Sequence, residues 1–319
     1  MKDASRPATW KILLAFSIIY FVWGSTYLAI RVAVREAPPL LLAGLRFFIA
    51  GLILYAWLRL RGTPNPTRRE WGTAALLASL IFLLDYGCLF WAEQRVPSGI
   101  TAVILATIPV FITLLEIILL RSQRLTLRLG VALLVGLGGV AFLMNRSLSF
   151  GEAPINRAGA SALLIAAFTW SLATILTRKV RLPESKAMSS ATQMLTGGVQ
   201  LFVVAALRGE FAGFHPGAVS WNAWFALAYL ILAGSIVGFT AYVWLLHYES
   251  PTKVGTYAYV NPVVAVTLGY FLGGEAVGPR TLLGTALVLA SVITIATIRA
   301  HADPRAPVRE RELAEVSEA

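Results

Sequence analysis

The chain has 319 residues, of which 57% are hydrophobic and only 13% are charged, and its formal net charge is +11. Soluble chains carry about 25% charged residues, so this composition excludes an ordinary soluble protein and is typical of a protein with many membrane spans. The positive charge does not indicate nucleic acid as a partner, because the lysines and arginines fall in short loops between apolar stretches.

Apolar stretches of about 20 residues, the length of a helix that crosses a bilayer, follow one another along the whole chain. The first half contains Ile12–Ile30, Pro39–Leu58, Trp71–Trp91, Gly99–Leu120 and Leu129–Asn145. The second half contains Ala158–Thr177, Ala187–Leu207, Trp221–Leu246, Val254–Gly274 and Thr281–Ile298. We therefore predict an all-α polytopic protein with ten transmembrane helices in a lipid bilayer. The first stretch continues to Ile30 without a cleavage site, which favours a retained helix over a signal peptide.

The distribution of lysine and arginine predicts the orientation of these spans. With the N-terminus inside, the inner segments hold 19 of these residues and the outer loops hold 7. This excess follows the positive-inside rule and predicts that both ends are cytoplasmic. Residues 1–11 form the N-terminal segment, and the polar residues 299–319 are expected to be a disordered cytoplasmic tail.

The two halves, residues 12–145 and 158–298, are related as repeats. Four residues of the first half recur 147 positions later: Trp23, Arg31, Arg46 and Gly51 correspond to Trp170, Arg178, Gln193 and Gly198. Because each half has an odd number of spans, the second copy is expected to be inverted relative to the first. Inverted repeats are typical of secondary transporters, which bind substrate near the bilayer midplane between the repeats.

A proline interrupts the apolar segment from Gly255 to Glu275 near its middle. Pro262 cannot donate the hydrogen bond to the carbonyl of Ala258, which leaves a polar backbone group beside Tyr257, Tyr259 and Asn261. Pro97 and Pro109 in the first half match Pro251 and Pro262 in the second. We predict helix breaks at Pro109 and Pro262 and a working site close to them.

Two segments resemble the repeat signatures of the EamA family in the drug/metabolite transporter superfamily. They are WGSTYLAIRVAVREAPPLLLAGLRFFIAG, from Trp23 to Gly51, and TYAYVNPVVAVTLGYFLGGE, which ends at Glu275. The resemblance implies a ten-helix permease of the inner membrane with a central cavity, whose relatives often export amino acids or other small metabolites. One departure is that Gly274 and Glu275 correspond to Ser122 and Gln123, so a paired glutamate is not conserved between the halves.

Two tryptophans are predicted near the middle of the membrane. Trp23 and Tyr27 share a helix face with Arg31, and Trp170 occupies the same position relative to Arg178. Each tryptophan lies about 12 Å inside the boundary that its arginine marks. Because tryptophan normally prefers the interface, these two residues either pack between helices or form the wall of a substrate cavity.

Arg46 and Asp85 are predicted at a common depth, roughly 10 Å below the outer end of their spans. A single charge at this depth is costly, so we expect a mutual ion pair. This pair either has a structural role or takes part in coupling, with Asp85 binding a proton or Arg46 a substrate carboxylate. Glu116 lies nearer the inner boundary, close to Arg121 and Arg124, and we expect it to reach the interface.

The predicted substrate-binding residues combine these positions with their neighbours. They are Trp23, Tyr27, Arg46, Asp85, Tyr86, Trp170, Gln193, Tyr257, Tyr259 and Asn261. Trp91 and Tyr242 are further candidates, although aromatic residues on helices more often pack. Gly136, Gly138 and Gly139, and Ala286 and Ala290, form small-residue faces that pack either within one chain or in a homodimer.

The leading functional prediction is a secondary transporter that exports a small metabolite, such as an amino acid, by alternating access around a central cavity. No GxxxxGK[ST] loop is present, so coupling to a proton or another ion and passive exchange stay open. We expect no cofactor and no metal, since three histidines and one cysteine show no ligand spacing. The alternatives are a noncatalytic receptor or assembly subunit and, with less support, a membrane-embedded enzyme, which would need a nucleophile and a base together.

Overall fold

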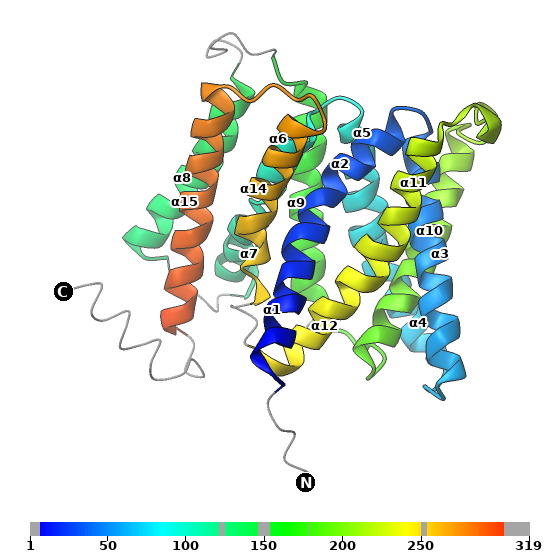
Figure 1. Ribbon diagram of the computed structural model, residues 1–319. Coiled ribbons are helices and arrows are strands. Elements are labelled where there is room, and N and C mark those ends of the chain that lie inside the picture. Colours follow the sequence, from blue (N-terminus) through cyan, green and yellow to red (C-terminus); the bar gives the residue numbers. More distant parts are fainter. Residues whose placement is uncertain (1–6, 121–124, 146–153, 178, 250–253, 303–319) are drawn as a thin grey trace.

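The computed structural model describes residues 7–120, 125–145, 154–177, 179–249 and 254–302, and every regular element in these ranges is helical (Figure 1). The first half contains α1 (Thr9–Ser17), η1 (Ile18–Val22), α2 (Trp23–Val34), α3 (Pro39–Leu60), α4 (Arg68–Ala78), η2 (Ser79–Tyr86), α5 (Gly87–Glu93), α6 (Ser98–Leu105), α7 (Ile108–Leu115), η3 (Glu116–Leu120) and α8 (Leu127–Met144). The second half contains α9 (Arg157–Thr177), α10 (Lys186–Leu207), η5 (Pro216–Ala218), α11 (Trp221–Tyr229), η6 (Leu230–Val237), α12 (Gly238–Tyr248), α14 (Tyr257–Phe271) and α15 (Pro279–Ala302).

Nine helical stretches within the described residues are long and apolar enough to cross a membrane. Their bounds lie within a few residues of the predicted spans, as Arg68–Glu93 does for Trp71–Trp91. The predicted span Val254–Gly274 corresponds to α14, whose 15 residues are fewer than the roughly 20 that cross a bilayer unaided. The polytopic helical fold is confirmed, and the count of ten spans stays a prediction.

The two prolines at which we expected helix breaks lie in different surroundings. In the first half α6 ends at Leu105, α7 begins at Ile108, and Pro109 lies in the first turn of α7, where its missing N–H costs little. In the second half α14 continues through Pro262 without interruption, which corrects the break expected there. Helices in membranes tolerate an internal proline when neighbouring helices supply polar partners for the freed backbone groups.

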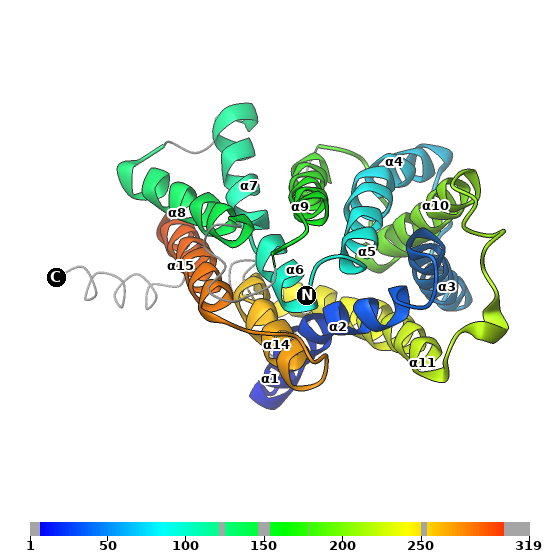
Figure 2. The same cartoon turned by 90° about the horizontal axis from the view of Figure 1, so that it is seen from above.

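Helices at corresponding positions of the two halves pack antiparallel. A Cβ atom added to Gly51 of α3 would lie 2.8 Å from the backbone nitrogen of Leu195 in α10, and one added to Gly198 would lie 2.7 Å from that of Phe48. At the beginning of α3, the N–H of Leu41 donates to Oε2 of Glu210, just beyond the end of α10 (2.9 Å). Seen from above, α3 and α10 lie side by side at one end of the molecule (Figure 2).

A second antiparallel pair, α8 and α15, lies at the other end of the molecule (Figure 2). Gly136 of α8 faces Ser291, whose Oγ donates to the carbonyl of Ala132 (2.6 Å), and Gly139 faces Val288. The glycine face of α8 therefore packs within the chain. A Cβ atom added to Gly138, also on α8, would lie in open space, and Ala286 and Ala290 are exposed on α15.

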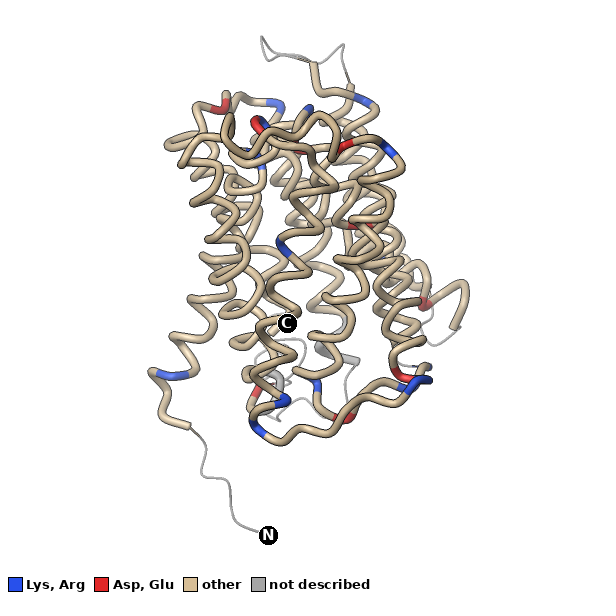
Figure 3. The backbone as a smooth tube through the Cα atoms, turned by 90° about the vertical axis from the view of Figure 1, so that its right-hand side faces the viewer, with Lys and Arg blue, Asp and Glu red and all other residues tan. Residues whose placement is uncertain are grey.

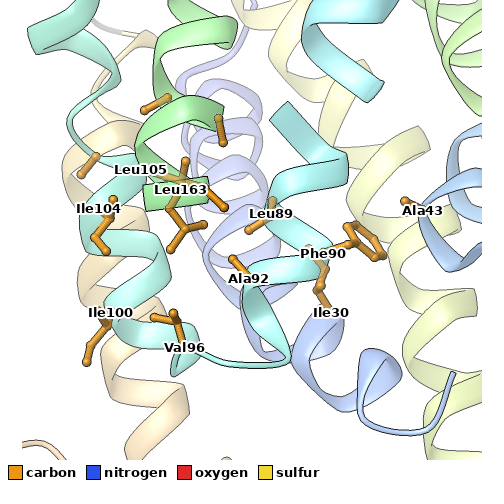
Figure 4. Close-up of a cluster of buried hydrophobic side chains, with 14 of the residues drawn as sticks. Ile30, Ala43, Leu89, Phe90, Ala92, Val96, Ile100, Ile104, Leu105 and Leu163 are labelled. Atoms are coloured by element: carbon orange, nitrogen blue, oxygen red, sulfur yellow. The ribbon is translucent and has the colours of Figure 1, made fainter. Parts of the chain in front are cut away.

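The largest buried cluster joins both halves. It includes Ile30 of α2, Phe90 of α5 and Leu163 of α9, and Figure 4 shows how these side chains converge with their neighbours. Charged residues lie mainly at the two ends of the helices, with few between them (Figure 3). At one end, exposed Glu36 accepts hydrogen bonds from the N–H and Oγ of Ser220 (2.7 Å each), and these bonds lower the pKa of its carboxyl. Ser220 itself caps α11, because its Oγ accepts from the N–H of Ala223 (3.3 Å).

Candidate functional site

A cavity of about 840 Å³ lies between the two halves of the chain. Among the predicted substrate-binding residues, those in its wall are Trp23, Tyr27, Arg46, Tyr86, Trp170, Gln193, Tyr257, Tyr259 and Asn261, and Pro109 and Pro262 line it as well. The cavity is large enough for a small metabolite. Of the predicted set, only Asp85 does not contribute to the wall.

Three π-helical segments contribute to the cavity wall. Tyr86 belongs to η2, Glu116 to η3, and Gly234 and Ser235 to η6. A π-helical turn is wider than an α-helical one and leaves the local hydrogen-bond ladder irregular, which is why such turns are frequent at functional sites. The wall of this cavity therefore contains backbone that departs from regular α-helix on three separate spans.

Trp23 both packs between helices and lines the cavity, so its two interpretations are not exclusive. Its Nε1 donates to the carbonyl of Gly234 (3.1 Å). Its ring centroid lies 5.4 Å from that of Tyr242 and 5.0 Å from that of Tyr257, the latter in an edge-to-face arrangement. These rings give the cavity a rigid aromatic wall formed by α2, α12 and α14.

A second group of aromatic rings includes Trp170, which corresponds to Trp23 in the second half. The ring of Tyr86 lies 4.5 Å from that of Phe47 and 6.2 Å from that of Trp170, measured between centroids. Trp170 therefore borders the cavity together with residues of the first half. Trp91, in contrast, does not line the cavity, and the guanidinium of Arg95 lies 3.9 Å above its ring.

Arg46 is buried in the middle of α3, with 3% of its surface exposed. Its Nε donates to Oγ of Ser235 (3.0 Å), and its guanidinium carbon lies 4.8 Å and 5.3 Å from the ring centroids of Phe47 and Tyr86. Its Nη1 is buried without a hydrogen-bond partner. The cavity wall thus contains a cation whose hydrogen-bonding capacity is only partly used.

The ion pair predicted between Arg46 and Asp85 is wrong. Within the described residues Arg46 bonds to Ser235 instead, and Asp85 is buried with Oδ1 unpaired. The sequence predicts a common depth for the two residues, but depth along a helix does not fix the direction in which a side chain points. Asp85 lies outside the cavity wall and Arg46 within it.

Asn261 and Gln193 add polar groups to the cavity wall. The Asn261 side-chain nitrogen reaches the carbonyls of Tyr257 (3.2 Å) and Tyr20 (3.1 Å) when the amide is oriented toward them. The side-chain nitrogen of Gln193 donates to the carbonyl and the Oγ of Ser189 (3.1 and 3.0 Å). Gln193 is therefore a neutral group at the position that corresponds to Arg46.

Glu116 lines the cavity, a position that we had not predicted for it. Its predicted neighbours Arg121 and Arg124 lie outside the described residues. Other wall residues, Ser190 near the beginning of α10 and Ala296 near the end of α15, belong to the same end of the helix bundle. The cavity wall thus extends from the middle of the molecule toward this end.

The opposite end is joined by a network around Arg31 and Glu275. The Nε of Arg31 lies 3.2 Å from Oε1 of Glu275, and its Nη1 donates to the carbonyls of Glu93 (3.2 Å) and Val96 (2.5 Å). Glu275 also accepts hydrogen bonds from the N–H and Oγ of Ser98 (2.7 and 2.8 Å) and from the N–H of the residue that follows Ser98 (3.0 Å). Three helices, α2, α6 and α14, are therefore tied together here.

The sequence did not indicate the roles of Gly234 and Ser235, because small residues in an apolar segment carry no signal of their own. Glu275 stood out only through the family signature that it ends. Arg178, Gln123 and Pro251, the second members of three predicted pairs, lie outside the described residues.

Comparisons with known proteins agree with this architecture. The profile of the EamA-like transporter family matches residues 9–145 and again residues 157–297. The inner membrane transporter YedA of Escherichia coli is 37% identical over 295 residues, which cover 92% of this chain and 93% of YedA. The transporter YoaV of Bacillus subtilis is 24% identical over 88% of this chain and 95% of its own, and PecM of Dickeya dadantii is 26% identical over 87% and 89%.

One solved crystal structure has the same fold, with a TM-score of 0.58 at 21% identity, covering 90% of this chain and 96% of the other. The helical fold, the internal cavity and these relatives define a membrane transporter. The chain belongs to the EamA-like transporter family of the drug/metabolite transporter superfamily. The resemblance predicted from the two signature segments is therefore confirmed.

Proposed function

We propose that the chain is a secondary transporter that exports a small metabolite, such as an amino acid, across the inner membrane by alternating access. The observation that carries this proposal is the cavity of about 840 Å³, whose wall includes residues of both halves. Binding sites of secondary transporters lie between repeats near the midplane, and this cavity meets that description.

The antiparallel pairing of corresponding helices supports two inverted five-helix repeats. α3 pairs with α10, and α8 pairs with α15, as expected when the second repeat is related to the first by a two-fold axis in the membrane plane. Two such repeats can rock against each other around a fixed site. The proposed repeats are residues 12–145 and 158–298.

The described conformation supports a transporter that is closed outside and loads from the cytoplasm. Arg31 and Glu275 join helices at the end where the positive-inside rule predicts the outside. The cavity wall extends toward the other end, where Ser190 and Glu116 lie. In export, substrate enters from that end, and the Arg31 network opens to release it.

The proposal is tested by flux measurements with purified protein in proteoliposomes. Labelled amino acids and small organic acids are offered, and saturable counterflow that empty liposomes lack is expected. A receptor or assembly subunit would produce no saturable flux, and an enzyme would release a chemically altered solute. Absence of saturable flux for every solute offered would reject the transporter.

Two substitutions on α14 form a matched pair for this assay. Tyr257 lines the cavity, whereas Phe271 is 73% exposed on the outer surface of the same helix. Tyr257→Ala is expected to reduce flux about tenfold, the equivalent of ~1.4 kcal/mol of lost interaction. Phe271→Ala is expected to leave flux unchanged, and equal losses in both variants would argue against the cavity as the transport site.

A further inference from the structure

The charge of Arg46 is the least explained feature of the cavity. A guanidinium keeps its proton in proteins, so this residue brings a permanent positive charge into the middle of a membrane-spanning helix. Such a charge is costly unless it meets an anion or several hydrogen-bond acceptors. Among the described residues Arg46 has one hydrogen-bond partner, Ser235, and its Nη1 is buried without any.

No carboxylate of the chain compensates this charge within the described residues. Asp85, the partner predicted from the sequence, does not pair with Arg46 among the described residues and lies outside the cavity wall. Glu116 is the acidic residue in the wall, and Arg46 forms no ion pair with it. Among the described residues Arg46 thus lacks a compensating anion, and a ligand that enters the cavity could supply one.

The surroundings of Arg46 hold the guanidinium ready for such an anion. The ring centroids of Phe47 and Tyr86 lie 4.8 and 5.3 Å from its guanidinium carbon, and Ser235 accepts a hydrogen bond from its Nε. A Cβ atom added to Gly234 would lie 3.2 Å from Nη2, so this glycine allows the guanidinium to approach η6. A guanidinium held in this way loses little side-chain entropy when it binds a planar carboxylate through two hydrogen bonds.

We propose that the ligand of this cavity is a small monocarboxylate whose carboxylate binds Arg46 and whose body contacts the rings of Trp23, Tyr242 and Tyr257. This inference rests on the proposed transport function and specifies its substrate class. A single carboxylate is favoured because Gln193, at the position corresponding to Arg46, is neutral. Apart from Arg46, the described wall residues include no lysine or arginine that could bind a second acidic group of the ligand. Such a group would instead share the cavity with the acidic side chain of Glu116.

The test compares carboxylates with their amides, which have nearly the same shape but lack the negative charge of the carboxylate. Phenylacetate and phenylacetamide, lactate and lactamide, and phenylalanine and phenylalaninamide are added to the purified full chain, and the melting temperature is followed. A ligand that binds only the folded protein raises this temperature. At least one carboxylate is expected to bind about tenfold more tightly than its amide, because hydrogen bonds between charged partners are stronger than neutral ones.

Variants at the same position complete the test. Arg46→Gln gives both repeats the same residue and is expected to abolish the preference for the carboxylate. Arg46→Lys keeps the charge without the planar fork and is expected to retain part of it. Because the wild-type comparison needs no variant, a variant that fails to fold does not weaken the test.

Three outcomes overturn the carboxylate site: equal binding of carboxylate and amide, wild-type binding by folded Arg46→Gln, or no stabilisation by any carboxylate. The transport proposal fails separately. Saturable flux of a neutral solute without carboxylate binding keeps the transporter and removes this substrate class. Carboxylate binding that depends on Arg46 but produces no flux keeps the site and removes the transporter.

Discussion

Single glycines determine how closely the two halves approach each other. Gly51 and Gly198 hold corresponding positions in the repeat, and each faces backbone atoms of the opposite helix at a distance that leaves no room for a side chain. Small residues at such crossings allow the close helix packing that stabilises helix pairs in membranes. The repeat thus preserves a pair of glycines because both helices need the same close approach.

Replacing Gly198 by alanine is expected to destabilise the protein. The added Cβ would lie 2.7 Å from the nitrogen and 2.8 Å from the Cα of Phe48, and backbone atoms cannot move aside as a flexible side chain can. Overpacking of this kind costs about 1–3 kcal/mol. The apparent Tm of Gly198→Ala in detergent is expected to fall by about 3 °C or more.

Gly138→Ala is the matched control, since no atom lies within 4 Å of the added Cβ. Alanine is a better helix former than glycine by up to about 1 kcal/mol, so this variant is expected to match or exceed the wild type in Tm. A Gly198→Ala variant as stable as Gly138→Ala would contradict the close approach of α3 and α10.

Among the elements, α14 and the turn that follows it explain why the second signature ends in two glycines and a glutamate. After α14, Gly274 adopts a left-handed conformation with φ of 62°, which glycine adopts without strain. This turn brings Glu275 to the N-terminus of α6, where its carboxylate accepts two backbone N–H groups. The positive end of the α6 dipole and Arg31 both stabilise that negative charge.

Glu275→Gln removes this charge while keeping the size of the side chain. The neutral amide would leave Arg31 without its ion-pair partner and would weaken the cap of α6. The expected loss of stability is about 2 kcal/mol, the range for hydrogen bonds to a charged group. Thermal unfolding in detergent measures it.

Glu210→Gln serves as the control for this cap. Glu210 also accepts a backbone N–H, that of Leu41, but it forms no ion pair among the described residues. A neutral amide oxygen can still accept that hydrogen bond, so the loss is expected to be clearly smaller. If Glu275→Gln and Glu210→Gln lose equal stability, Arg31 contributes nothing beyond an ordinary cap.

For the whole molecule, the orientation in the membrane decides which end of the cavity faces the cytoplasm. Cys88 is the single cysteine of the chain, so Cys88→Ala provides a background for one reporter cysteine at a time. Pro64 lies between α3 and α4, and Ala212 lies beyond the end of α10; both are exposed. They belong to opposite ends of the helix bundle because α3 and α10 run antiparallel.

A membrane-impermeant maleimide added to intact cells is expected to label Ala212→Cys and to leave Pro64→Cys unlabelled. The excess of lysine and arginine predicts that the loop at Pro64 lies inside. After the membrane is permeabilised, both cysteines are expected to react, which shows that each is accessible. Labelling of Pro64→Cys alone in intact cells would reverse the orientation and turn the proposed export into uptake.

The amino-acid sequence was sufficient to predict the class of fold and several residues of the cavity wall. Long apolar stretches must form helices in a bilayer, because no water is present to satisfy the backbone groups of other structures. The repeat then identified Trp23 and Trp170, and the proline signature identified Tyr257 and Asn261. These signals lie within single segments, so they can be read without knowledge of how the segments meet.

The tertiary structure alone decided which charged groups meet. Arg46 and Asp85, predicted at a common depth, do not pair among the described residues, whereas Nε of Arg31 and Oε1 of Glu275, far apart in the sequence, lie 3.2 Å apart. The π-helical segments that carry Tyr86 and Ser235 also left no signal in the sequence. Such features depend on helix rotation and on packing between distant segments, and the apolar pattern of a membrane span restrains neither of these.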